Sequence, residues 1–152
     1  SLADKYLSRL EKFCRDKIRL VVSGEREGLP AALVEKITAI EEKTKDYDAI
    51  CVNLCINYGG QRDIAEALKK INEKKLDVTI ENIYSNLYNS FIPNPDLIIR
   101  TGGQKRLSNF LLFQSAYSEL YFSDTLWPDF SLSEYNEIVN DYSVRTRNFG
   151  GI

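Results

Sequence analysis

The chain has 152 residues, with 20 Lys and Arg against 22 Asp and Glu, and its formal net charge of −2 provides no broad cationic field. This composition is typical of one ordinary soluble domain and argues against a nucleic-acid-binding protein. The absence of His excludes Ser-His and Cys-His nucleophile pairs, so any chemistry falls to Asp, Glu, Arg, Lys, Ser and Tyr.

The first half of the chain alternates helical and strand patterns. Apolar residues at three- and four-residue steps predict a helix over residues 1–16, and a short strand follows over 18–22. A second helix opens at Pro30, where the missing N–H costs nothing. The strongest strand covers 49–56, is apolar on both faces and is therefore expected inside a helix-covered sheet. The Gly59-Gly60 turn then leads into a helix whose apolar positions are Ile64, Ala65, Leu68 and Ile71.

The second half continues the same alternation. A short helix is predicted over 79–87, and Pro93 and Pro95 separate it from a strand over 96–100. Ser108 is expected to cap a helix through Leu112, a strand follows over 119–122, and Ser131 with Glu134 forms the capping box of the last helix. This alternation predicts an α/β fold with a mainly parallel sheet flanked by helices.

The cysteines Cys14, Cys51 and Cys55 match neither a CxxC pair nor a zinc-ligand spacing. We expect buried, reduced thiols and no zinc site, which fits a cytoplasmic protein. No apolar run reaches the roughly 18 residues that a membrane span needs, and no leader-like segment precedes the first predicted helix.

The most promising chemistry lies after the 96–100 strand. Ligands of open parallel sheets collect at the carboxyl ends of the strands, where this chain places two Gly-Gly loops. The second loop combines three cations, flexible N–H groups and a hydroxyl, contributed by Arg100, Gly102, Gly103, Lys105, Arg106 and Ser108. These groups predict an oxyanion cradle for phosphate or diphosphate, although glycine pairs also serve tight turns alone. GxxxxGK[ST] and GxGxxG are absent, so P-loop and dinucleotide-binding sites are not supported.

Three other features can be interpreted from the residues around them. Glu119 lies between apolar residues, where a carboxylate needs a partner such as Arg or a metal ion. Trp127 and Phe130 are predicted to pack in the core. The Lys69-Lys70 and Lys74-Lys75 pairs are predicted to be solvated helix ends.

Several ordered segments resemble the cis-prenyltransferases, specifically the undecaprenyl diphosphate synthases. They are residues 98–112, which contain Ile98-Ile99-Arg100-Thr101-Gly102-Gly103, then Ala116-Tyr117-Ser118-Glu119-Leu120-Tyr121-Phe122 and Leu126-Trp127-Pro128-Asp129-Phe130. Asn57-Tyr58-Gly59-Gly60 and the ending 145–151 fit the same family.

The resemblance implies condensation of isopentenyl diphosphate with an allylic diphosphate such as farnesyl diphosphate, giving a long Z-polyprenyl diphosphate with the help of Mg²⁺. It implies a homodimer, associated with membranes at most peripherally through its lipid product. By position, Glu119 would bind Mg²⁺, and Ile50 and Leu54 would line the apolar product tunnel. The isopentenyl diphosphate would be held by Arg100, Arg106, Ser108, Gly102 and Gly103.

The resemblance covers about the C-terminal two-thirds of the family's domain, so residues 1–152 are expected to form a truncated version of that fold. The family's Asp-Gly-Asn-Gly-Arg-Trp segment, whose Asp binds Mg²⁺ and diphosphate, does not occur in the chain. No catalytic residue is therefore assigned, and the chain alone is expected to be inactive.

Two positions depart from the family pattern. Asn148 stands where the ending has Arg, and Gln61 replaces a common Arg, with Arg147 and Arg62 adjacent to them. Two alternative readings are a noncatalytic partner subunit of a cis-prenyltransferase complex and an unrelated phosphate-binding α/β protein. Product length and the allylic starter are not defined by the sequence.

Overall fold

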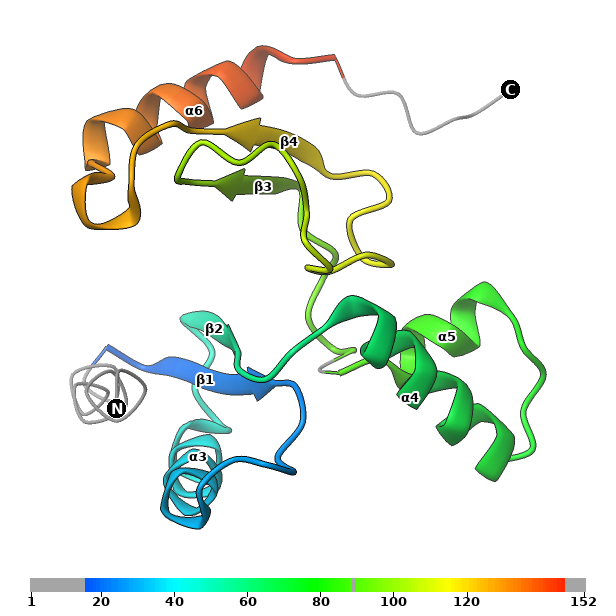
Figure 1. Cartoon of the computed structure of the whole chain (residues 1–152). Helices are drawn as coiled ribbons and strands as arrows, with labels where there is room; N and C mark the ends of the chain where they lie inside the picture. Colours follow the sequence, from blue (N-terminus) through cyan, green and yellow to red (C-terminus); the bar gives the residue numbers. More distant parts are fainter. Residues whose placement is uncertain (1–15, 89, 147–152) are drawn as a thin grey trace. The chain divides into compact units, whose positions relative to one another are not determined.

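The computed structural model describes residues 16–88 and 90–146 (Figure 1). The chain divides into two compact units, residues 1–92 (unit 1) and 93–152 (unit 2), which are described separately. The division falls at Pro93, one of the two prolines expected to end the preceding helix. The helix predicted over 1–16 and the ending 147–151 fall on residues outside the described part, Asp16 apart.

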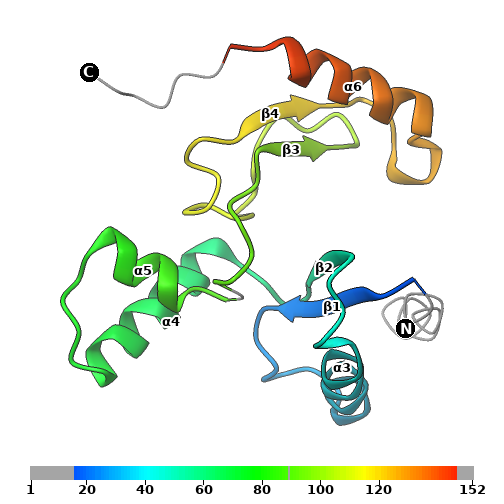
Figure 2. The ribbon, with the colours of Figure 1, turned by 180° about the vertical axis from the view of Figure 1, so that it is seen from behind.

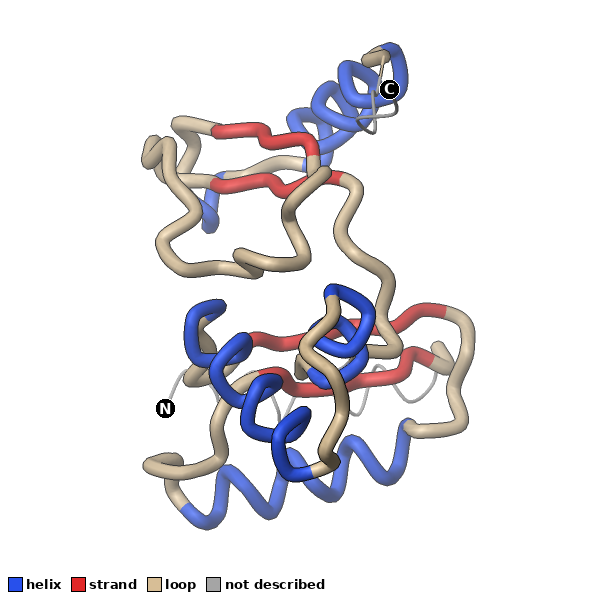
Figure 3. Tube along the Cα trace, turned by 90° about the vertical axis from the view of Figure 1, so that its right-hand side faces the viewer, coloured by secondary structure: helices blue, strands red, loops and turns tan. Residues whose placement is uncertain are grey.

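Unit 1 contains a parallel strand pair with its crossover helix. Strand β1 (Ile18–Ser23) pairs with β2 (Ile50–Cys55) in a register that runs from Ile18 opposite Ile50 to Ser23 opposite Cys55. Helix α3 (Ala31–Thr44) connects them and lies along one side of the pair (Figure 3). The core consists of Leu20, Val22, Leu33 and Ile37, with Val52, Leu54 and Ile56 packed against it. The predicted parallel arrangement is confirmed.

The outer edge of β1 is covered by side chains of α3 and of the loop that connects β1 to α3. The N–H of Leu20 donates to Thr44 Oγ1 at 3.0 Å, and the N–H of Val22 donates to Glu41 Oε1 at 2.7 Å. Arg26 Nη2 donates to the Val22 carbonyl at 3.1 Å and also pairs with Glu41. These side chains satisfy backbone groups that a further strand would otherwise use. Thr44 and Glu41, from the second half of α3, therefore cover this edge of β1.

Strand β2 is less buried than its sequence predicts. Val52 and Leu54 pack against the core, but Ile50 is 59% exposed and Cys51 is exposed. Among the described residues the sheet of unit 1 has two strands, and α3 covers one side of it, so the expectation of burial on both faces is wrong. Cys55 is partly buried, whereas Cys14 lies outside the described residues.

Helices α4 (Gly60–Glu73) and α5 (Ile80–Asn86) form the rest of unit 1 and lie against each other (Figure 1). Thr79 caps α5 by accepting from the Asn82 N–H. The lysines at the end of α4 are not merely solvated. Lys74, the C-cap residue, donates from Nζ to Asn86 Oδ1 at 2.7 Å, and Lys70 Nζ donates to the Asn86 carbonyl at 3.1 Å. They join the end of α4 to the end of α5.

Unit 2 repeats the parallel pairing on a smaller scale. Strand β3 (Leu97–Arg100) pairs with β4 (Glu119–Phe122), with Leu97 opposite Glu119 and Arg100 opposite Phe122. A short 3-10 helix η1 (Trp127–Asp129) leads to helix α6 (Leu132–Val144), which runs beside β4 in two opposite views (Figure 1, Figure 2). The buried residues described in this unit are Ile98, Ser123 and Ile138.

The helix predicted to start at Ser108 does not form. Residues 108–117 make turns and bends, and Ser108, Asn109 and Leu111 have φ angles of +50°, +66° and +44°. A right-handed helix needs negative φ, so these angles exclude it. Trp127, predicted in the core, is 68% exposed and stacks on Phe130 with the ring centroids 6.1 Å apart.

Within the described residues, none of the helices combines the length and the apolar character that crossing a bilayer requires.

Candidate functional site

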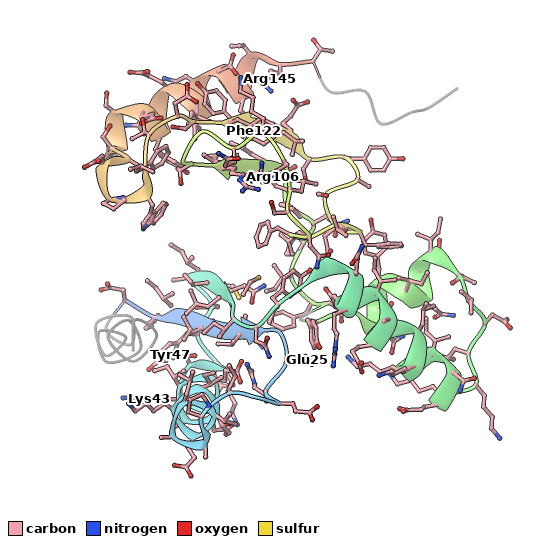
Figure 4. The ribbon with its side chains drawn as sticks, viewed as in Figure 1. Glu25, Lys43, Tyr47, Arg106, Phe122 and Arg145 are labelled. Atoms are coloured by element: carbon pink, nitrogen blue, oxygen red, sulfur yellow. The ribbon has the colours of Figure 1, made fainter. Side chains whose placement is uncertain are left out.

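A cavity of about 390 Å³ opens at the carboxyl end of β3 in unit 2. Arg100 is the last residue of β3, and Arg106 lies on the loop that follows, beside the strand pair in Figure 4. The lining residues are Ile98, Ile99, Arg100, Thr101, Arg106, Leu107, Ser108 and Phe110. The structure therefore brings Arg100, Arg106 and Ser108 to one cavity, while Lys105 is not part of its lining.

The Arg100 side chain organises this loop. Its Nη1 donates to Ser108 Oγ at 2.8 Å and also to the backbone carbonyl of Arg106. The loop needs such support because Ser108, Asn109 and Leu111 occupy the left-handed region, which costs free energy for any residue other than glycine. Arg100 thus holds both the Ser108 hydroxyl and the backbone of Arg106, the second arginine of the cavity.

Among the described residues, the cations around the cavity lack a carboxylate partner. In the part of the chain that the structure describes, Arg100, Lys105 and Arg106 have no carboxylate within ion-pair distance, whereas Arg62 pairs with Glu25 and Arg145 pairs with both Glu119 and Asp141. Guanidinium groups beside a hydroxyl suit an anion that offers several oxygen atoms. The cavity therefore has the chemistry of a phosphate or diphosphate site.

Gly102 and Gly103 do not offer their backbone N–H groups to the cavity, although the sequence suggests that they would. The N–H of Gly102 donates to the Thr125 carbonyl at 2.8 Å, and that of Gly103 donates to the Ser123 carbonyl at 2.9 Å. Both donors predicted for the oxyanion are thus engaged within the protein. The φ angles of +86° and +74° explain why glycine stands at both positions.

Glu119 lies at the other end of the strand pair. It begins β4 opposite Leu97, whereas Arg100 ends β3, and three residues of strand correspond to roughly 10 Å. Its Oε2 accepts from Arg145 Nη1 at 2.8 Å, which meets the predicted need for a partner. The hydrogen bond to Glu119, followed by the one to Asp141, raises the pKa of Arg145.

The described residues do not by themselves fit a Mg²⁺ site at Glu119. Its carboxylate is occupied by a guanidinium, and among the described residues no three His, Cys, Asp or Glu gather around a common point. Mg²⁺ also binds through a single carboxylate plus substrate phosphates, but those phosphates would have to reach Glu119.

A second hollow, of about 220 Å³, lies after the carboxyl ends of β1 and β2 in unit 1. It is lined by Glu25, Asn57, Tyr58, Gly59 and Arg62. Asn57 Nδ2 donates to the Glu25 and Glu27 carbonyls at 3.2 and 3.1 Å, and Arg62 Nε donates to Glu25 Oε1 at 2.5 Å. The hydrogen bond to Glu25 raises the pKa of Arg62; Figure 4 labels Glu25. Arg62, the neighbour of Gln61, is therefore already paired.

Asp63 is a buried residue that the sequence reasoning missed. It is 1% exposed and accepts from the Tyr58 hydroxyl at 3.0 Å and from the Tyr88 N–H at 2.7 Å. The buried positions Asp63, Ala67 and Ile71 follow a four-residue spacing, which was the available signal. The predicted stripe contains only apolar residues and so leaves out Asp63, while it includes Leu68, which is 39% exposed.

The two candidate tunnel residues lie on one face of β2 but differ in environment. Leu54 packs against the core of unit 1, whereas Ile50 is exposed at the start of the strand. Their place in a product tunnel stays a prediction.

Comparison with known proteins identifies the family. A family model described as putative undecaprenyl diphosphate synthase matches residues 1–150. An isoprenyl transferase of Thermotoga maritima is 45% identical over 148 residues, which cover 94% of this chain and 64% of that relative. The chain thus spans slightly less than two-thirds of that relative's length.

Solved structures agree with this match. A probable undecaprenyl diphosphate synthase from Campylobacter jejuni is 44% identical with a TM-score of 0.93, covering 99% of this chain and 72% of that one. Lavandulyl diphosphate synthase from Lavandula x intermedia, solved with dimethylallyl diphosphate, is 29% identical with a TM-score of 0.83, covering 97% and 71%. The chain therefore belongs to the prenyltransferase family of the undecaprenyl diphosphate synthases.

Proposed function

We propose that unit 2 binds the diphosphate group of isopentenyl diphosphate and contributes this half-site to a cis-prenyltransferase. The reaction condenses isopentenyl diphosphate with an allylic diphosphate, such as farnesyl diphosphate, into a long Z-polyprenyl diphosphate. The observation that carries the proposal is the cavity where Arg100, Arg106 and Ser108 meet. The relatives named isoprenyl transferase and the one solved with dimethylallyl diphosphate support the substrate class.

The lining of the cavity matches the two parts of this substrate. Guanidinium forks bind phosphate oxygens bidentately, and Arg100 is already oriented by its Nη1 bonds to the loop. A donor that is held in place before binding loses less conformational entropy. Ile98, Leu107 and Phe110 supply apolar surface for the short hydrocarbon part.

The remaining features implied by the resemblance stay predictions. For Glu119 to bind Mg²⁺, the ion would have to replace the Arg145 guanidinium, so we assign no reaction step to it. The tunnel role of Ile50 and Leu54 and the homodimer are likewise expected from the resemblance. Gly102 and Gly103 are proposed to shape the loop instead of donating to the diphosphate.

Calorimetric titration of isopentenyl diphosphate into single variants tests the site. Arg106→Ala removes charge-assisted hydrogen bonds and is expected to weaken binding by roughly tenfold to a hundredfold. Lys105→Ala is the matched control, because it removes the neighbouring charge without touching the lining. Inorganic diphosphate as the second ligand isolates the contribution of the headgroup. Equal losses for both variants would mean diffuse electrostatics and would contradict the proposal.

A further inference from the structure

Ser123 is a polar residue with 4% exposure immediately after β4. Its N–H donates to the Arg100 carbonyl at 2.8 Å, and its carbonyl accepts from the Gly103 N–H at 2.9 Å. Its Oγ accepts from the Thr125 N–H at 3.0 Å, and the Thr125 carbonyl accepts from the Gly102 N–H. Residues 123–125 thus hold the end of β3 and both glycines of the following loop.

The Ser123 hydroxyl itself is held by helix α6. It donates its single hydrogen to Glu134 Oε1, which leaves the oxygen lone pairs directed to the Thr125 N–H. The N–H of Glu134 donates to Ser131 Oγ at 3.1 Å, as the predicted capping box requires. The Glu134 Oε1, however, reaches Ser123, so this residue connects the start of α6 to the loop.

Helix α6 provides a fixed support for this contact. The Glu119–Arg145 pair joins the start of β4 to the end of α6, while the Ser123–Glu134 bond joins the end of β4 to the first turn of α6. Eleven helical residues rise about 16 Å and four strand residues about 13 Å, a difference of about 3 Å that the long side chains of these pairs span. Ile138, which is buried, lies between them in the sequence of α6.

From this geometry we infer that Glu134, acting through Ser123, is a positioning residue for the loop that presents Arg100 and Arg106 to the diphosphate. Neither Glu134 nor Ser123 lines the cavity. The inference rests on the proposed function only for the identity of the ligand; the bond network itself is independent of it.

Titration of inorganic diphosphate into Glu134 variants provides the binding test. Removing a nearby negative charge should by Coulomb's law strengthen anion binding, so loss of affinity would reveal positioning. Glu134→Ala is expected to weaken binding at least fivefold, and Glu134→Gln, which keeps an acceptor oxygen, is expected to restore most of it. Glu137→Ala removes the same charge from an exposed position of α6 and should bind like the wild type.

Amide hydrogen exchange separates this inference from the proposed function. In the wild type, the Gly102 and Gly103 amides should be protected although Gly103 is exposed. Glu134→Ala or Ser123→Ala should accelerate their exchange at least tenfold while the β1 and β2 amides keep their rates, and Glu134→Gln should not. Failure of the wild type to bind diphosphate would contradict the proposed function, and the exchange rates would still decide the inference. Unprotected glycine amides in the wild type, or unchanged exchange and binding in Glu134→Ala, would overturn it.

Discussion

Gly24 and Gly28 flank the loop after β1, and both have positive φ angles, +119° and +81°. A Cβ on Gly24 would lie 2.1 Å from the Ile56 carbonyl oxygen, whereas one on Gly28 would meet no atom within 4 Å. Gly24→Ala therefore combines backbone strain with a clash against backbone and should lower the free energy of unfolding by about 3 kcal/mol or more. Gly28→Ala should cost about 1–2 kcal/mol from strain alone. Urea denaturation measures both, and equal losses would contradict this reading.

At the residue scale, the sequence predicts best those contacts that are local. Arg100, Arg106 and Ser108 follow one strand within nine residues, so a cavity at its carboxyl end could be inferred. The hydrogen bonds of the Gly102 and Gly103 amides could not be inferred, because their acceptors are carbonyls about twenty residues later in the chain. Asp63 escaped notice for a similar reason, since Tyr88, one of its partners, lies beyond α5.

At the element scale, the covered edge of β1 depends on Thr44, which is 0% exposed. Thr44→Val keeps the shape but leaves the Leu20 N–H without its acceptor, and we expect a loss of about 1–3 kcal/mol in unfolding free energy. Thr38→Val is the matched control on α3, because its exposed hydroxyl donates within the helix, to the Val34 carbonyl. It should change stability by about 0.5 kcal/mol or less. Thermal unfolding compares the stability of the two variants. An unchanged stability of Thr44→Val would contradict a stabilising role of this hydroxyl at the edge of β1.

Strands and most helices could be predicted because the spacing of their apolar residues and the Pro, Gly and capping residues at their ends agree with the fold. The helix proposed after Ser108 was wrong because a capping residue and apolar neighbours do not reveal that the Arg100 side chain holds the loop in left-handed conformations. The exposure of Ile50 could likewise not be predicted, since the apolar pattern of a strand does not tell how many strands and helices surround that strand.

At the scale of the whole molecule, the family was recognisable because several motifs occur in the same order and spacing. The separation of Glu119 from Arg100 could not be recognised from the sequence, because it depends on the register of β3 against β4. A residue that the family pattern assigns to a metal is in this chain a partner of Arg145.

The 152-residue chain alone is not expected to elongate farnesyl diphosphate. It contains no Asp-Gly-Asn-Gly-Arg-Trp segment, so the departing diphosphate lacks the charge stabilisation which that segment is expected to supply. Incorporation of labelled isopentenyl diphosphate into solvent-extractable polyprenyl product, in the presence of Mg²⁺, measures this. The Thermotoga maritima relative, assayed under the same conditions, is the positive control. Turnover by this chain at the relative's rate would contradict this expectation and would mean that another carboxylate of the chain takes the role of the missing Asp.

The central claim is that the diphosphate binds at the carboxyl end of β3, and site-resolved NMR during titration with isopentenyl diphosphate tests it most directly. The account predicts that amide and guanidinium signals change at residues 98–101 and 106–110, which contain the cavity lining. The second hollow, with its mutually paired Glu25 and Arg62, should stay unchanged. Changes confined to residues 57–62, with none at Arg100, Arg106 or Ser108, would contradict the account.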